Sequence, residues 1–132
     1  MDLCSGVQID ETDYSYAGAE VHRIVKGMYL QAGSIKGYQG REFPDESFTV
    51  KHSEAGLLGM CQRSGLPNTN ACQFYVTTAA PLSFMDNKNV VFGRVIEGMN
   101  FVKKIDALDC VNEKSANMPV TICQAGAYTA TA

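Results

Sequence analysis

The chain contains no tryptophan, only two histidines and four prolines among its 132 residues. A Ser/His/Asp triad needs a histidine beside a nucleophile and a carboxylate, and neither His22 nor His52 lies in a nucleophile motif. The HExxH, GxGxxG and P-loop signatures are absent as well. The sequence carries no recognisable covalent, metal-dependent or nucleotide-dependent chemistry, so we expect neither a metal nor a cofactor.

Long apolar runs and basic clusters are also missing. No stretch approaches the roughly 20 apolar residues that a membrane helix needs, and the acidic start MDLCSGVQIDETD lacks the order of a secretory signal. The net charge is −3, and no basic cluster is longer than Lys103 and Lys104. We expect no membrane or nucleic-acid partner, and a soluble protein of the cytoplasm, with the nucleus left open.

The five cysteines form no CxxC pair and are odd in number. These features argue against a disulfide framework and against a metal site. We expect buried or partly buried thiols that stay reduced in an intracellular compartment. The five are Cys4, Cys61, Cys72, Cys110 and Cys123.

Apolar residues make up 45% and charged residues 19% of the chain, which is an ordinary globular mixture. A length of 132 residues predicts a single domain spanning residues 1–132. Short runs rich in β-branched and aromatic residues alternate with turn residues, which predicts many short antiparallel strands that close into a barrel. These runs begin at Val21, Met28, Ser47, Gly56, Gln73 and Asn89.

One segment has a helical period. From Gly98 onward, apolar residues recur at every third position with charged residues between them. This spacing predicts a short amphipathic helix that covers one end of the barrel. A last strand is expected from Val120, followed by a frayed terminus at residues 129–132.

Arg23 is a charged residue inside an apolar strand pattern, and Gln31 follows eight residues later. Strand periodicity places the two on one face only if no bend intervenes, and Gly27 can introduce one. Taken alone, a strand arginine is usually a surface residue and a glutamine among apolar neighbours a satisfied polar group. Spacing by itself is therefore weak evidence for a site.

Three segments, in this order, resemble the cyclophilin-type peptidyl-prolyl isomerases: HRIVKGMYLQAG from His22, PNTNACQFYVT from Pro67 and DNKNVVFGRVIEGM from Asp86. The similarity runs from about residue 3 to residue 127. It implies a mainly β fold, an antiparallel barrel capped by helix. It also implies an enzyme that accelerates rotation about X-Pro peptide bonds, aids protein folding and needs no cofactor.

The resemblance also implies roles for individual residues. Arg23 and Gln31 are the implied catalytic residues, and the implied substrates are proline-containing peptides or proteins. Nine further residues are implied to bind the substrate: Met28, Tyr29, Cys61, Gln62, Gln73, Tyr75, Phe84, Met85 and Asn89.

Most of this implied pocket departs from the family pattern. The family has tryptophan at the position of Phe84, and losing the indole N–H predicts weak binding of cyclosporin A. The match begins near Leu3, which implies that the family's first two strands and first helix are missing. Two alternatives therefore stay open: a weak or inactive module that binds proline-containing partners, and a fragment that pairs with another chain through open strand edges.

Overall fold

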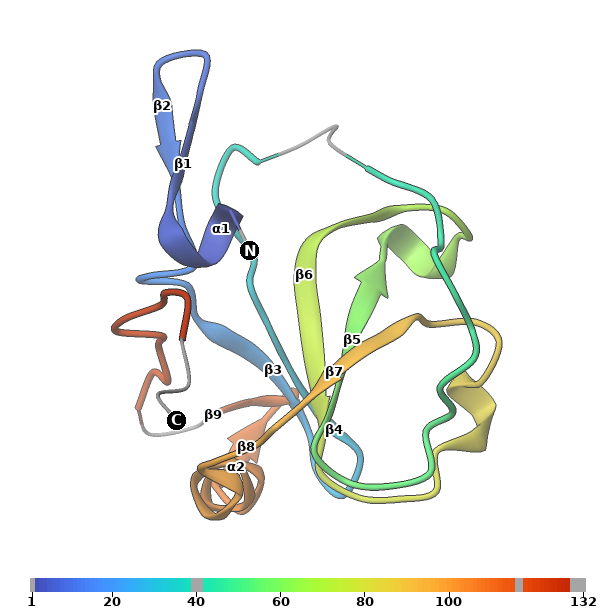
Figure 1. Cartoon of the computed structure of the whole chain (residues 1–132). Helices are drawn as coiled ribbons and strands as arrows, with labels where there is room; N and C mark the ends of the chain where they lie inside the picture. Colours follow the sequence, from blue (N-terminus) through green and yellow to red (C-terminus); the bar gives the residue numbers. More distant parts are fainter. Residues whose placement is uncertain (1, 39–41, 116–117, 129–132) are drawn as a thin grey trace.

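A computed structural model describes residues 2–38, 42–115 and 118–128 (Figure 1). Its strands are β1 (Val7–Ile9), β2 (Thr12–Tyr14), β3 (Val21–Val25), β4 (Tyr29–Ala32), β5 (Leu57–Gln62), β6 (Asn70–Thr77), β7 (Val91–Arg94), β8 (Cys110–Val111) and β9 (Lys114–Ser115). Its helices are α1 (Asp2–Ser5), α2 (Met99–Asp106) and the 3-10 turns η1 (Arg63–Gly65) and η2 (Ser83–Met85). None of the described helices is long and apolar enough to cross a bilayer.

The central sheet has five antiparallel strands in the order β3-β4-β6-β5-β7. This arrangement confirms the predicted mainly β, cyclophilin-like fold. Within the described residues the sheet stays open, because β3 and β7 do not pair with each other. The outer edge of β3 is instead bonded by later segments: Val21 N donates to Val120 O at 2.8 Å and Ile24 N to Glu113 O at 2.6 Å.

Five of the predicted strand runs are confirmed as β3 to β7. The run from Ser47 is wrong, since residues 47–52 form no strand. Two of its backbone N–H groups find side-chain acceptors instead: Thr49 N donates to Ser47 Oγ, and His52 N donates to the Asp86 carboxylate at 2.7 Å. The last strand is also wrong, because among the described residues from 118 to 128 the only β pairing is the isolated bridge between Thr121 and Glu20. The expected frayed terminus lies outside the described residues.

Two hairpins escaped prediction, β1–β2 and β8–β9. The β1–β2 hairpin projects from the body of the molecule in Figure 1. Both hairpins turn through two residues with positive φ, Asp10 and Glu11 in the first, Asn112 and Glu113 in the second. Such turns usually contain glycine, and neither pair does, so the usual sequence signal is absent.

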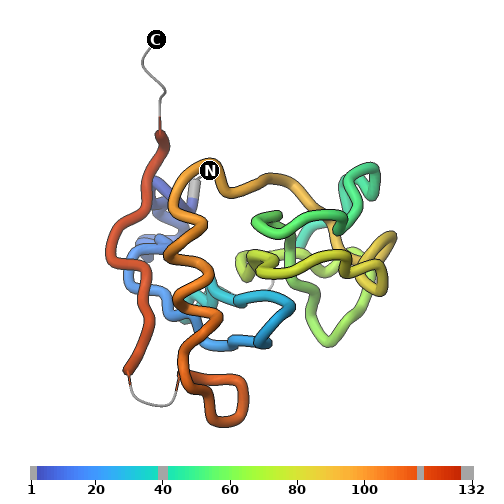
Figure 2. The backbone as a smooth tube through the Cα atoms, turned by 90° about the horizontal axis from the view of Figure 1, so that it is seen from below, coloured from blue at the N-terminus to red at the C-terminus, as the bar shows by residue number. Residues whose placement is uncertain are grey.

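The helix α2 confirms the predicted amphipathic segment. It contacts β3 and β4, and it lies on the side of the molecule opposite the loop between β6 and β7 (Figure 2). The Asp106 carboxylate in its last turn accepts hydrogen bonds from Gly27 N at 3.2 and 3.3 Å and from Thr78 Oγ1 at 3.1 Å. These contacts attach the helix to the turn between β3 and β4.

Candidate active site

The hairpin of β3 and β4 brings Arg23 and Gln31 together as cross-strand partners. Between the strands, Gly27 has a φ of 73°, in the left-handed region where glycine carries no steric cost. The chain therefore bends at Gly27, and the two residues meet across a hairpin rather than along one strand.

Gln31 is held by the next strand of the sheet. Its Nε2 donates to Gln73 Oε1 at 2.8 Å, across the β4–β6 pair. Gln73 also lines a cavity of about 470 Å³ together with Cys61 and Gln62. Three of the residues implied to bind the substrate therefore border one open cavity beside Gln31.

Arg23 is held by an acidic residue that the sequence did not indicate. Its Nε donates to Glu113 Oε2, and Glu113 raises the pKa of the guanidinium through this hydrogen bond. The guanidinium carbon also lies 5.8 Å from the centroid of the Tyr29 ring. In the described part of the chain, the Nη groups of Arg23 donate to no acceptor, so they are available to a substrate.

An apolar cluster lies beside this hairpin. Tyr75, Leu82 and Met85 are buried at its centre, and three half-buried residues pack against them: Met28, Tyr29 and Cys61. Burial raises the pKa of the Cys61 thiol to about 12, so at neutral pH it packs as an uncharged group. Every residue of the cluster except Leu82 was implied by the family resemblance to bind substrate. In the sequence Leu82 has no feature that sets it apart from other apolar residues.

The remaining implied residues lie around this cluster. Phe84 stands next to Met85 on η2 and is 54% exposed. Asn89 Nδ2 donates to Met60 O at 3.2 Å, and Gln62 Nε2 donates to Lys88 O at 2.7 Å. Through these bonds, both amides join β5 to the segment between η2 and β7.

Beneath the cluster is a buried histidine that the sequence did not assign to the site. His52 is 1% exposed, its Nε2 lies 2.6 Å from the Tyr75 hydroxyl, and its Nδ1 lies 2.8 Å from Asp86 Oδ1. The Asp86 carboxylate also accepts the backbone N–H of His52, and these two bonds hold its pKa below the ordinary value. In the sequence His52 stands between Lys51 and Ser53, and nothing in that segment indicates such a contact.

All five cysteines are free. Cys72 is buried and three others are half-buried, as expected, but Cys123 is exposed, which corrects the expectation for that residue. Among the described residues, no group of three or more His, Cys, Asp or Glu side chains is placed to hold a metal ion.

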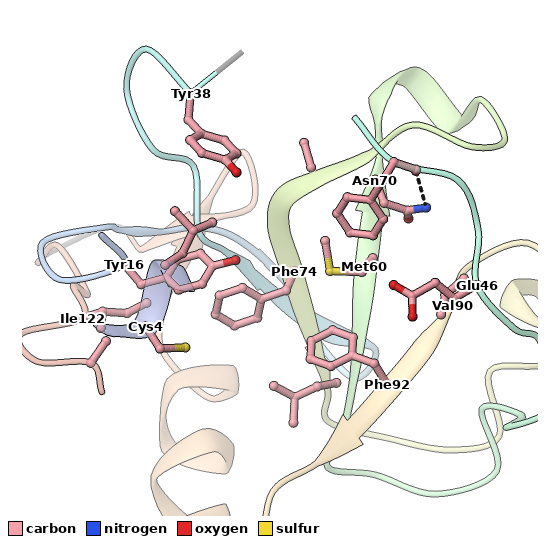
Figure 3. A pocket seen from close by; sticks show the side chains of 15 residues that line it. Cys4, Tyr16, Tyr38, Glu46, Met60, Asn70, Phe74, Val90, Phe92 and Ile122 are labelled. Atoms are coloured by element: carbon pink, nitrogen blue, oxygen red, sulfur yellow. Dashed lines mark hydrogen bonds between the residues drawn. The ribbon is translucent and has the colours of Figure 1, made fainter. Parts of the chain in front are cut away.

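A larger cavity of about 740 Å³ lies against the other face of the sheet (Figure 3). Phe74, Met60 and Phe92 line it, whereas Tyr75, the neighbour of Phe74, belongs to the apolar cluster. Successive residues of a strand point to opposite faces, which explains this separation. None of the residues implied for the site lines this cavity.

Comparison with known proteins assigns the chain to a family. The family model described as cyclophilin type peptidyl-prolyl cis-trans isomerase/CLD matches residues 1–127. The chain belongs to the cyclophilin family. Its activity is peptidyl-prolyl cis–trans isomerisation.

A curated relative agrees with this assignment. The chain is 37% identical to the protein named peptidyl-prolyl cis-trans isomerase H from Mycosarcoma maydis. The alignment extends over 133 residues and covers 94% of this cyclophilin and 83% of the relative.

Proposed function

We propose that catalysis takes place where the β3–β4 hairpin meets the apolar cluster, with Arg23 as the catalytic residue. The observation that carries this proposal is the position of the guanidinium, paired across the hairpin with Gln31 and lying over the Tyr29 ring. A cationic fork with free Nη groups therefore borders the apolar residues that suit a proline ring.

The chemistry requires only that the enzyme stabilise a twisted bond. Rotation about a peptide bond meets a barrier of about 18–20 kcal/mol, because the nitrogen lone pair conjugates with the carbonyl. In the twisted transition state that lone pair localises on nitrogen, so a positioned cation gains interaction energy as the bond turns. Arg23 suits this role, since its guanidinium is always charged and keeps a fixed geometry.

The other side chains would hold the substrate. Gln31, fixed by Gln73, would bind the peptide backbone, and the cluster would grip the proline ring. Because Tyr75 is only 1% exposed, a proline reaches its ring when a covering side chain, Met28 or Tyr29, moves aside. Methionine has a flexible side chain, which makes this movement inexpensive.

Replacing Arg23 tests the assignment. Arg23→Ala should lower kcat/KM for an Ala-Pro peptide by about 10²–10³-fold, as expected when a positioned donor to the transition state is lost. Peptide affinity, measured by NMR titration, should change by less than about threefold, because the ground state gains little from this contact. The matched control is Arg94→Ala, which removes an exposed strand arginine on β7. An unchanged kcat/KM in folded Arg23→Ala would exclude Arg23 from catalysis.

We further propose that the substrates are extended proline-containing segments of proteins, that the enzyme aids protein folding, and that it works in the cytoplasm. A refolding assay on a protein limited by proline isomerisation tests the folding role. Acceleration by the wild type and none by Arg23→Ala would support it. Equal refolding rates with and without the wild-type enzyme would contradict it.

Cyclosporin A is expected to bind weakly. Phe84 occupies the position where the family has tryptophan, so it cannot donate the hydrogen bond of an indole N–H. An isothermal titration of the purified domain should give no saturation at nanomolar cyclosporin. Nanomolar inhibition of peptide isomerisation would contradict this expectation.

A further inference from the structure

Tyr75 lies at the centre of the apolar cluster, and the residue is only 1% exposed, so its hydroxyl is buried together with its ring. A buried hydroxyl without a partner is costly, because it has lost its hydrogen bonds to water. His52 supplies the partner, with its Nε2 2.6 Å from the hydroxyl oxygen and the two rings stacked at 5.9 Å.

Gly59 provides the space for this arrangement. A Cβ at residue 59 would lie 2.1 Å from both the Tyr75 Cζ and its hydroxyl oxygen. The hydroxyl end of the ring therefore occupies the volume that a side chain on β5 would otherwise take. Only the apolar part of Tyr75 is left to face Met28 and Tyr29.

His52 is itself held by the segment at residues 82–86, which contributes Leu82 and Met85 to the cluster. Its backbone N–H and its Nδ1 both contact the Asp86 carboxylate, at 2.7 and 2.8 Å. Its carbonyl accepts the Leu82 N–H at 2.9 Å. His52 therefore connects Tyr75 to the segment at residues 82–86.

We propose that His52 is a positioning residue of the active site: its contact with the Tyr75 hydroxyl holds the ring in place, so that proline can bind over the ring once Met28 or Tyr29 has moved aside. Without a hydrogen-bond partner at that place, the hydroxyl finds water by rotating into the space where the proline ring binds. This inference rests on the proposed proline site. It predicts that replacing His52 weakens peptide binding through the unpaired Tyr75 hydroxyl, and not through unfolding of the protein.

His52→Leu is the first test, since leucine fills the buried site without an acceptor. If the ring then occupies the proline site in nine molecules of ten, the apparent peptide affinity falls about tenfold. Adding Tyr75→Phe removes the hydroxyl that needs a partner, so the double variant should regain at least fivefold of that affinity. A merely structural role for His52 leaves the double variant as weak as His52→Leu.

His52→Gln is the matched conservative variant. The glutamine amide can present an acceptor near the place of Nε2, so this variant should bind peptide at least fivefold more tightly than His52→Leu. The Tyr75 hydroxyl proton gives a direct reading by NMR, with slow exchange with water in the wild type and in His52→Gln, and fast exchange in His52→Leu. If His52→Leu fails to fold, His52→Asn replaces it, because asparagine is too short to reach the hydroxyl.

Peptide affinity is measured by NMR titration of the full chain with an Ala-Pro peptide. Binding by the wild type and the loss of turnover in Arg23→Ala establish the site independently of His52. With the site so established, wild-type affinity in His52→Leu, or a double variant no tighter than the single one, would overturn the positioning role alone.

Discussion

At the scale of single residues, the guanidinium of Arg23 has two uses. Its Nε donates to the protein, and its Nη groups are available to the substrate. Glu113 is 90 positions from Arg23 in sequence, yet its carboxylate accepts the Nε hydrogen bond. The backbone holds it there, since Ile24 N donates to Glu113 O at 2.6 Å. This contact uses one edge of the guanidinium and leaves the Nη groups for the peptide.

Glu113→Gln should lower kcat/KM about two- to fivefold, because an ion pair this exposed contributes at most about 1 kcal/mol. The Arg23 and Glu113 side chains are 43% and 49% exposed, so stability should be nearly unchanged. Peptide kinetics and a urea titration check both values. Glu97→Gln is the control, an exposed carboxylate outside the site. A rise in kcat/KM would mean that Glu113 restrains Arg23 instead of orienting it.

At the scale of elements, the site depends on how α2 meets the β3–β4 turn. The Asp106 carboxylate accepts the Gly27 N–H and the Thr78 hydroxyl, so the end of the helix holds the turn that carries Met28.

The central strands and α2 could be predicted from the sequence, because periodicity and turn residues are local patterns. The hairpins β1–β2 and β8–β9 could not be predicted, because their turns lack the glycine that usually indicates a hairpin.

Asp106→Ala should lower the free energy of unfolding by about 1–2 kcal/mol, because it leaves two hydrogen-bond donors without their acceptor. A urea titration followed by circular dichroism measures this change. Asp109→Ala is the matched control, since Asp109 is exposed just beyond the same helix. Equal losses in the two variants would show that the contact of Asp106 with the turn adds nothing to stability.

At the scale of the whole molecule, stability should depend on pH through Asp86. The hydrogen bonds from His52 hold the pKa of this carboxyl below its ordinary value, which means that the folded state favours the charged form. The resulting stabilisation is present above the unfolded pKa of about 3.9 and is lost as pH falls through the lower folded pKa.

The Asp86→Asn variant tests this dependence. Urea titrations from pH 7 down to pH 3 should show the wild type more stable at neutral pH, with the difference shrinking below about pH 4. Asp13→Asn, which removes an exposed carboxylate on β2, is the control. A difference that stays constant with pH would show that the Asp86 charge does not contribute.

The sequence by itself determined the family, the five central strands, α2 and most residues of the apolar cluster, because strand period, helix period and family motifs are all local patterns. It predicted wrongly at residues 47–52, where side chains accept the N–H groups of Thr49 and His52 that a strand would have paired. Only the tertiary structure decided what surrounds the proposed catalytic residues. The contacts of Glu113 with Arg23 and of His52 with Tyr75 join segments 90 and 23 positions apart, and no local pattern records such distances.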